Sequence, residues 1–317
     1  MPLYLTESDV ESLLDMPLAL KAVEEVFAAK CRGEVVNLPR RRIPLGAGSY
    51  NLMAAAWPSR GVVGHKSYTA TSRGARFHVS LYCSEGRGLL AIVEAGRLGQ
   101  IRTGAASGVA TRFMALPIPI KVGIIGSGYQ AQTQLEAIAT ACDVSEALVY
   151  SRTVKRRNEF ALRMSEQLNI SVSATESPQL CIENADVVVT ITSSKTPVIR
   201  AEWVRTGTHI NAAGNNSWLK RELDVATVKK CDVIATDDVD QAKIECGELM
   251  RAAEAGHLNW DNVIPLHQIV SGSVPGRRTE NDITLFASQG VACEDLAVVD
   301  RIYRLAIERG VGTDLPG

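Results

Sequence analysis

Residues 121–139, KVGIIGSGYQAQTQLEAIA, contain a glycine-rich turn of the kind that binds nucleotide phosphates. Gly126, Gly128 and Ala131 follow a short apolar run and open a stretch with helical periodicity. The first glycine permits a tight turn, the second lets a pyrophosphate approach the backbone, and the small third residue lets the helix lie close to the sheet. Backbone N–H groups at the start of the helix then favour the anion. We expect a dinucleotide site here; the alternative is a tight strand-to-helix connection without a ligand.

The residues after the next apolar strand, ALVY, indicate which dinucleotide binds. NAD sites usually place Asp or Glu there for the ribose 2′-hydroxyl. This chain instead has Ser151, Arg152 and Thr153, with further basic residues at 155–157. Because a guanidinium suits phosphate geometry, the sequence favours NADPH over NADH. The alternative is a solvated basic start to a helix. The residues expected at the cofactor are Gly126, Gly128, Tyr129, Gln130, Ala131, Ser151, Arg152, Thr153, Thr192 and Ser288.

Histidine, serine and cysteine carry no recognisable catalytic motif. The five histidines lack metal-ligand spacing, and there is no Gly-x-Ser-x-Gly turn. The seven cysteines are scattered and include no Cys-x-x-Cys pair, so we expect reduced thiols and no metal site.

The order of elements predicts an α/β fold with two domains. From residue 120 onward, apolar strands alternate with helices, as in a Rossmann-type doubly wound parallel sheet. Residues 41–95 are typical of antiparallel strands, and Ser8 and Asp15 are the expected caps of two helices within residues 6–33. Pro117 and Pro119 mark a hinge. The last stretch, 282–310, predicts a strand and a long amphipathic helix that rejoins the first domain.

Charge and hydropathy exclude several classes of protein. The 34 Lys and Arg residues nearly balance the 35 Asp and Glu residues, so no long-range field favours nucleic acid or an anionic membrane. There is no apolar run of membrane-spanning length, and the N-terminus lacks a secretion pattern. We expect a cytoplasmic protein with a small-molecule substrate.

The whole chain resembles the ornithine cyclodeaminase and μ-crystallin family. The segments that carry the resemblance are LPRRRIPL with NLMAAAW, the lysine in VVGHKSY, IRTGAASGVAT, GSGYQAQTQ, SRT, HINAAGNNSWLKRELD and GRRTENDITLFASQGVACEDLAV. The resemblance implies a homodimer in which a discontinuous α+β domain, 1–117 with 291–317, binds substrate and forms the dimer interface. Residues 118–290 would form the dinucleotide-binding Rossmann domain.

By residue matching, the resemblance places a substrate carboxylate on Arg40, Lys66 and Arg102, with Lys66 as the catalytic residue. The chemistry is sensible, because Arg binds carboxylates bidentately and Lys can manage a proton near a reacting nitrogen. Arg41 and Arg42 stand beside Arg40, so the sequence offers three adjacent arginines for this role.

Two amides mark a departure from the cyclodeaminases of this family, and both are candidate substrate-binding residues. Asn216 stands where those enzymes have an Asp that acts on the substrate amine, and Asn51 stands where they have an acidic residue. An amide cannot accept a proton as a carboxylate does. The chain therefore looks closer to the ketimine reductase-like members.

The leading hypothesis is an NAD(P)H-dependent imine or ketimine reductase that acts on a small α-imino acid. The substrate would be a cyclic pyrroline or piperideine carboxylate, or the imine of a 2-oxo acid. A second hypothesis is an ornithine- or lysine-type cyclodeaminase or an alanine-type amino acid dehydrogenase. A third is a non-catalytic, crystallin-like binding protein. Asp295 is expected to cap the terminal helix, with a place in the active site as the alternative.

Overall fold

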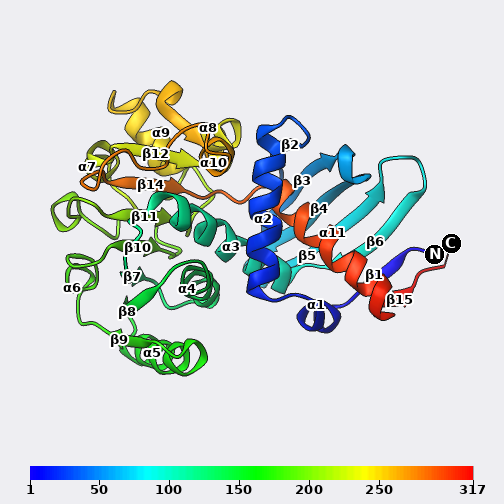
Figure 1. Cartoon of the computed structure of the whole chain (residues 1–317), viewed down its shortest axis with the longest axis horizontal. Helices are drawn as coiled ribbons and strands as arrows, with labels where there is room; N and C mark the ends of the chain where they lie inside the picture. Colours follow the sequence, from blue (N-terminus) through cyan, green and yellow to red (C-terminus); the bar gives the residue numbers. More distant parts are fainter. Residues whose placement is uncertain (317) are drawn as a thin grey trace. The chain divides into compact units, whose positions relative to one another are not determined.

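The computed structural model of the chain describes residues 1–316 and contains two compact units. Unit 1 comprises residues 1–102 together with the chain from residue 291 onward, and unit 2 comprises residues 103–290. Unit 1 is discontinuous because the C-terminal helix α11 (Ala292–Arg309) packs against α2 (Met16–Cys31), as Figure 1 shows. The first division lies inside helix α3 (Gly96–Met114), ahead of the expected hinge at Pro117, because this helix runs without a break through residue 102.

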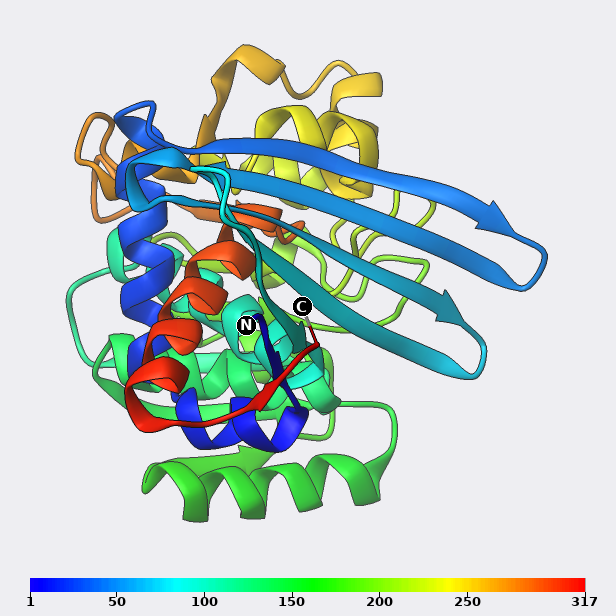
Figure 2. The same ribbon diagram turned by 90° about the vertical axis from the view of Figure 1, so that its right-hand side faces the viewer.

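Unit 1 is built on a seven-stranded sheet with the order β15-β1-β6-β5-β4-β3-β2. Strands β2 to β6 form an antiparallel meander, as the sequence predicts, and β1 pairs parallel to β6. Figure 2 shows the two long hairpins, β2–β3 and β4–β5, side by side. The strands are β1 (Leu3–Leu5), β2 (Val36–Leu45), β3 (Gly48–Trp57), β4 (Val62–Thr71), β5 (Gly74–Cys83), β6 (Gly88–Glu94) and β15 (Thr313–Asp314), with a 3-10 turn at Pro58–Arg60.

Helix α11 covers one face of this sheet, and α2 packs against α11. That face carries buried apolar side chains such as Met53 and Val79, which alternate with more exposed residues along the strands. The preceding helix α1 (Glu7–Leu13) begins at Thr6, which forms a capping box with Asp9, so the expected cap at Ser8 is wrong. Asp15 caps α2 as predicted.

Unit 2 contains an eight-stranded, all-parallel sheet with the order β13-β12-β14-β11-β10-β7-β8-β9. The predicted Rossmann-type doubly wound fold is therefore confirmed. Its strands are β7 (Ile120–Ile125), β8 (Val144–Tyr150), β9 (Ser171–Ala174), β10 (Val187–Thr190), β11 (His209–Ala212), β12 (Val233–Thr236), β13 (Val263–Pro265) and β14 (Thr284–Ala287). Its helices are α4 (Tyr129–Ala141), α5 (Val154–Leu168), α6 (Pro178–Ile182), α7 (Val225–Lys230), α8 (Val239–Glu245), α9 (Gly247–Glu254) and α10 (Leu266–Val270), with 3-10 turns at Ala201–Trp203 and Trp260–Asn262.

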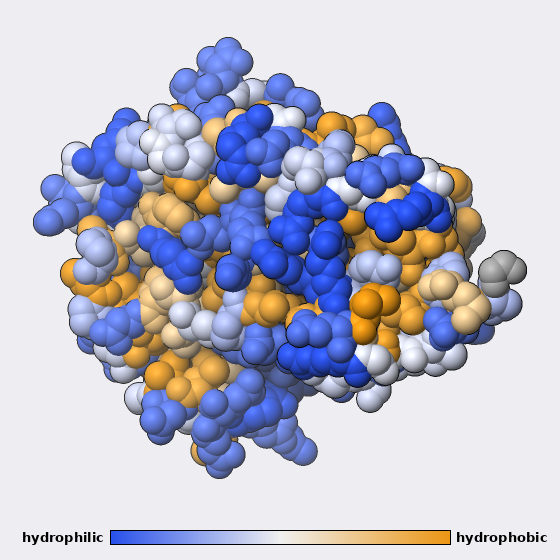
Figure 3. Space-filling model, turned by 45° about the vertical axis from the view of Figure 1, so that its right-hand side comes forward, coloured by the Kyte–Doolittle hydropathy of each residue, from blue (hydrophilic) through white to orange (hydrophobic). Residues whose placement is uncertain are grey.

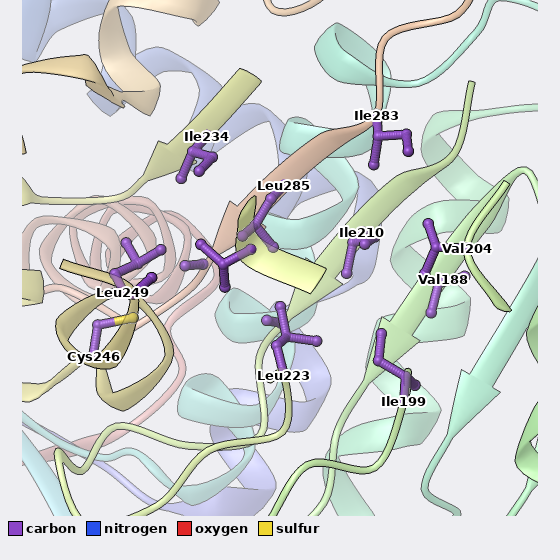
Figure 4. Close-up of a cluster of buried hydrophobic side chains, with 14 of the residues drawn as sticks. Val188, Ile199, Val204, Ile210, Leu223, Ile234, Cys246, Leu249, Ile283 and Leu285 are labelled. Atoms are coloured by element: carbon purple, nitrogen blue, oxygen red, sulfur yellow. The ribbon is translucent and has the colours of Figure 1, made fainter. Parts of the chain in front are cut away.

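Each face of the parallel sheet has its own apolar core, because successive strand residues point to opposite faces. On one face, Val122, Val187 and Val189 pack with α4 and α5. On the other face, strand residues such as Ile210 and Leu285 belong to one buried cluster with Leu249 of α9, as Figure 4 shows. The carboxyl ends of the strands are thereby held rigidly, and ligands bind at those ends in open sheets of this type.

The surface carries side chains of both kinds of hydropathy. Figure 3 shows hydrophobic residues reaching the surface in patches among hydrophilic ones. Within residues 1–316, none of the helices combines the length and the apolar character needed to cross a membrane. None of the seven cysteines, all within residues 1–316, forms a disulfide.

Candidate functional site

The glycine turn between β7 and α4 has the backbone that a pyrophosphate site requires. Gly126 has a φ of +124°, and a Cβ there would lie 2.4 Å from the carbonyl oxygen of Ile191. Only glycine fits such a position. Gly128 caps α4 with a φ of −84°, and a Cβ there would meet no atom within 4 Å. The space beside the first turn of α4 is therefore open, which fits a dinucleotide phosphate.

A cavity of about 680 Å³ extends from this turn along the carboxyl ends of β7, β8 and β10. Its lining includes six of the predicted cofactor residues: Gly126, Gly128, Ser151, Arg152, Thr153 and Thr192. Arg156 and the loop 192–198 complete the wall. No Asp or Glu lines the cavity within residues 1–316. A phosphate-bearing ligand would thus meet donors and cations rather than carboxylates.

The basic run after β8 divides into two groups. Arg152 and Arg156 line the cavity. Arg157 instead donates from Nη1 to the carbonyl oxygen of Ser151 at 3.0 Å and lies over the ring of Tyr150. The Ser151 hydroxyl is 2.8 Å from that of Ser127, which joins the first and second βα turns. Arg157 therefore supports the loop, while Arg152 and Arg156 are placed to meet a ligand.

The other predicted cofactor residues lie around this cavity or at a neighbouring strand end. Tyr129, Gln130 and Ala131 form the first turn of α4, and Ala131 is completely buried against the sheet. Ser288 follows β14, where its hydroxyl donates to Asp237 at 3.3 Å.

A second cluster of polar residues lies on the helix-covered face of the sheet in unit 1. Arg40 is 4% exposed, whereas Arg41 and Arg42 are exposed, so burial selects Arg40 from the three arginines. The pairing of β2 with β3 is irregular between Leu38 and Arg41, which accommodates the proline at residue 39 that cannot donate to the ladder. Arg40 Nε lies 3.3 Å from the sulfur of Met53.

Lys66 lies directly opposite Met53 on the neighbouring strand β4. Its side chain is buried, and its Nζ donates to Asp295 Oδ1 at 2.8 Å and sits 5.2 Å from the centre of the Phe77 ring. The ammonium also approaches Gly99 of α3, where a Cβ would lie 3.0 Å from Nζ. Strand, helix and glycine together fix the position of the ammonium group.

Arg102, in helix α3, is held by two adjacent acids at the start of α11. Its Nε donates to Asp295 Oδ1 at 3.0 Å, and its Nη1 donates to Glu294 Oε2 at 2.7 Å. Both acids are almost completely buried. Asp295 therefore bridges Lys66 and Arg102. Helix α11 begins at Ala292 with Val291 as its N-cap, so the predicted cap role of Asp295 is wrong.

Glu294, which accepts from Arg102, is not among the site residues predicted from the sequence. The signal that pointed to it is two adjacent acids in a segment that is otherwise apolar, because buried carboxylates need cationic partners. The partners themselves are about 190 to 230 residues away in the chain.

The ionic neighbours set the protonation of this cluster. Burial lowers the pKa of Lys66 to about 8, although Asp295 acts in the opposite direction. Burial raises the pKa of Asp295, but Arg102 and Lys66 outweigh burial and hold that pKa below its ordinary value. At neutral pH the lysine is thus mainly protonated and the aspartate is ionised.

The cluster combines buried cations with buried acids. Arg40, Lys66 and Arg102 are the cations, and Glu294 and Asp295 are the acids. Arginine and lysine side chains held in this way can bind a carboxylate through charge-assisted hydrogen bonds.

The two amides belong to different units. Asn51 is buried on β3, where its Oδ1 accepts from Arg42 Nε at 3.2 Å and its Nδ2 donates to the Ser49 hydroxyl at 3.0 Å. Asn216 is exposed in the loop after β11 of unit 2. The structure therefore places Asn51 with the cation cluster of unit 1 and Asn216 with the strand ends of unit 2.

Comparison with known proteins gives concordant matches over the full chain. The family model of the ornithine cyclodeaminase/mu-crystallin family matches residues 2–310. Iminosuccinate reductase of Paracoccus denitrificans is 30% identical, over 99% of this chain and 99% of its own length. Δ1-Pyrroline-2-carboxylate reductase of Thermococcus litoralis, solved with NADH and L-proline, has a TM-score of 0.95 at 31% identity and covers 99% of this chain and 100% of that one. An archaeal alanine dehydrogenase dimer with bound NAD has a TM-score of 0.94 at 33% identity, with 99% of each chain covered.

Proposed function

Because the chain belongs to the ornithine cyclodeaminase/mu-crystallin family, we propose that it is an NAD(P)H-dependent imine reductase acting on small α-imino acids. It is an oxidoreductase of C=N bonds, and its substrate is a cyclic pyrroline or piperideine carboxylate or the imine of a 2-oxo acid. The observation that carries this proposal is the convergence of buried cations in unit 1, where Asp295 joins Lys66 to Arg102 and Arg40 is buried on the same sheet face. An α-imino acid brings a carboxylate that such cations can bind.

Arg40 and Arg102 bind the substrate carboxylate. The bonds from Arg102 to Asp295 and Glu294 fix the plane of its guanidinium before substrate arrives. This preorganisation lowers the entropy cost of orienting the substrate. Asn51 adds a polar side chain on the same sheet face. Asn216, in unit 2, is the other residue proposed to bind substrate.

Lys66 supplies the proton. A dihydronicotinamide cofactor, when bound, would supply the hydride for the C=N carbon. Lys66 Nζ gives its proton to the imine nitrogen, becomes neutral, and regains a proton from water. Its pKa of about 8 suits this role, because a general acid works best when its pKa is near the working pH.

The preferred coenzyme is NADPH. The relatives solved with bound cofactor hold NADH or NAD. The support for NADPH is local: Arg152 and Arg156 line the cavity, and a serine follows β8 where NAD sites usually have an acid. Ser151 and Thr153 provide hydroxyl groups for the same phosphate.

Replacement of Arg152 by Glu tests this coenzyme preference. It should raise the KM for NADPH by about 10- to 100-fold, because a charge-assisted contact of about 1.5 to 3 kcal/mol is lost. The KM for NADH should change far less. Arg163→Glu makes the same charge change at an exposed position of α5 and is the matched control. An unchanged ratio of NADPH to NADH efficiency in the Arg152 variant would place the 2′-phosphate elsewhere.

We also propose that the protein is a homodimer that works in the reducing cytoplasm, where free thiols persist. Five exposed apolar residues of the β2–β3 hairpin carry the dimer proposal: Val36, Leu38, Ile43, Leu45 and Leu52. The pairing register places them on the sheet face opposite Met53 and Lys66. An apolar sheet face of this kind is typical of a protein interface, and a second copy of the chain is the proposed occupant.

The activity is tested by oxidation of NADPH and NADH with three imine sources: pyrroline-2-carboxylate, piperideine-2-carboxylate, and pyruvate with ammonia or methylamine. We expect reduction of at least one of them. Turnover of ornithine without added cofactor would favour the cyclodeaminase, and nucleotide binding with no turnover of any imine would favour a binding protein. Either result would overturn the proposal.

A further inference from the structure

One buried carboxylate in unit 2 joins two loops at the carboxyl edge of the parallel sheet. Glu222 is completely buried. Its Oε1 accepts from the backbone N–H of Thr192 at 2.6 Å, and its Oε2 accepts from that of Gly214 at 2.9 Å. Thr192 lies in the loop after β10, and Gly214 lies in the loop after β11. A single side chain therefore binds two neighbouring βα loops where ligands of such sheets bind.

The joined loops include part of the wall of the proposed dinucleotide cavity. Residues 192–198 of the β10 loop line that cavity. The β11 loop supports them, because Asn215 Nδ2 donates to the carbonyl oxygen of Ser194 at 3.3 Å. The backbone carbonyl of Glu222 accepts from Val198 N–H at 2.8 Å, so Glu222 binds the β10 loop at both of its ends.

The contact at Gly214 leaves no room for a side chain at this position. A Cβ there would lie 2.4 Å from Glu222 Oε2 and 2.5 Å from the backbone nitrogen of Thr192. Distances this short force the backbone or the carboxylate to move. The loop shape thus depends on the glycine and the carboxylate together.

A second carboxylate lies behind the first. Glu248, near the start of α9, is buried and accepts the backbone N–H of Glu222 at 2.7 Å. Arg221 attracts Glu248, and the thiol of Cys246 lies 3.8 Å from Glu248 Oε2. From β10 and its loop, the side chains of Thr190 and Thr192 face Glu222. Burial, with a smaller contribution from Glu248, raises the pKa of Glu222 to about 7.

We propose that Glu222 is a positioning residue whose carboxylate holds the β10 and β11 loops in the shape that receives the dinucleotide, and that its protonation weakens dinucleotide binding. This inference rests on the proposed cofactor site. The carboxylate accepts one N–H on each oxygen. A proton on either oxygen takes away acceptor capacity at one of these two bonds, so one loop loses its restraint.

The same titration has the opposite effect on folding stability. The pKa of Glu222 is higher in the folded chain than the ordinary value of 4.5, so the folded state binds more protons between pH 4.5 and 7. The contribution of Glu222 to stability therefore falls as the pH rises through this window. Dinucleotide affinity rises in the same window, and a purely structural role would not produce this opposition.

The test is the dissociation constant of NADH, measured by fluorescence titration of the full-length protein at pH 5.5 to 8.5. NADH is chosen because it has no 2′-phosphate that titrates in this range. For the wild type, affinity should fall about tenfold from pH 8 to pH 6, since about nine-tenths of Glu222 is protonated at the lower pH. Glu222→Gln, which places an amide N–H against one of the two donors, should bind about tenfold more weakly at pH 8 and show no such pH dependence.

Glu248→Gln is the matched variant, because its amide oxygen still accepts the Glu222 N–H while the negative charge is lost. It should keep tight binding at pH 8 and move the fall in affinity to lower pH. If wild type binds neither NADH nor NADPH at any pH, the proposed function fails. If wild type binds NADH and Glu222→Gln matches it across the pH range, only this inference is overturned. If Glu222→Gln does not fold, Glu248→Gln decides: NADH affinity that falls over the same pH range as in wild type would overturn this inference.

Discussion

Asp295 shows how single residues decide what the cation cluster of unit 1 can do. It accepts from Lys66 and Arg102 through one oxygen, Oδ1, so the two cations are held at a fixed separation. Without this carboxylate the two positive charges would repel each other in a buried environment. With it, Lys66 stays beside Arg102 in the buried cluster and has a pKa of about 8.

The pKa of Lys66 predicts the pH dependence of the reaction. Because the pKa is about 8 in the folded protein, the ammonium is available below pH 8 and is lost above it. The kcat/KM for imine reduction should therefore be level below about pH 7.5 and fall about tenfold per pH unit well above pH 8. Steady-state kinetics from pH 6 to 10 measure this.

Lys66→Arg is the control for this profile, since arginine stays charged throughout the range. It should react more slowly, on the order of 100-fold, and lose the decline above pH 8. An unaltered decline would assign the titration to another group.

The same titration changes folding stability in the opposite direction. Because the pKa of Lys66 in the folded protein lies below the ordinary 10.5, the folded state binds fewer protons than the unfolded state. The contribution of Lys66 to stability therefore rises between pH 8 and 10.5.

At the scale of elements, local patterns were predictable and distant pairings were not. The alternation of strands and helices after residue 120 and the glycine turn at 126–128 are local, and the structure has both the parallel sheet and the open turn. The neighbours of Lys66 come from α3 and α11, which no periodicity in β4 can indicate. The N-cap of α1 also differs from the prediction. It is Thr6, which forms a capping box with Asp9, and not Ser8.

The two glycines of the β7–α4 turn should separate stability from binding. Gly126→Ala forces a side chain into a left-handed backbone against Ile191, so it should lower the free energy of unfolding by about 1 to 3 kcal/mol and weaken dinucleotide binding. Gly128→Ala has an ordinary φ and open space, so it should cost about 1 kcal/mol or less. Its methyl group should nonetheless weaken NADPH binding about tenfold or more if the pyrophosphate lies there. Urea unfolding and fluorescence titration measure both quantities, and equal effects at the two sites would contradict this reading.

For the whole molecule, the apolar face of the β2–β3 hairpin predicts the oligomeric state. Leu38→Glu puts a charge in the proposed interface and should convert a dimer of about twice 34.2 kDa to a monomer, as measured by light scattering after gel filtration. Leu162→Glu, at an exposed position on α5, is the matched control and should leave the dimer intact. A wild-type protein that is monomeric at micromolar concentration would contradict the dimer.

The central claim is that buried cations of unit 1 bind a substrate carboxylate. Its most direct test compares two substrates, with and without the carboxylate, in two forms of the enzyme. The kcat/KM is measured for pyrroline-2-carboxylate and for the same ring without its carboxylate, with wild type and with Arg40→Lys. In wild type, removal of the carboxylate should lower kcat/KM about 100-fold or more, because a charge-assisted bidentate contact contributes about 3 kcal/mol. In Arg40→Lys the same change of substrate should lower kcat/KM much less. An equal loss in both proteins, or no loss in wild type, would contradict the account.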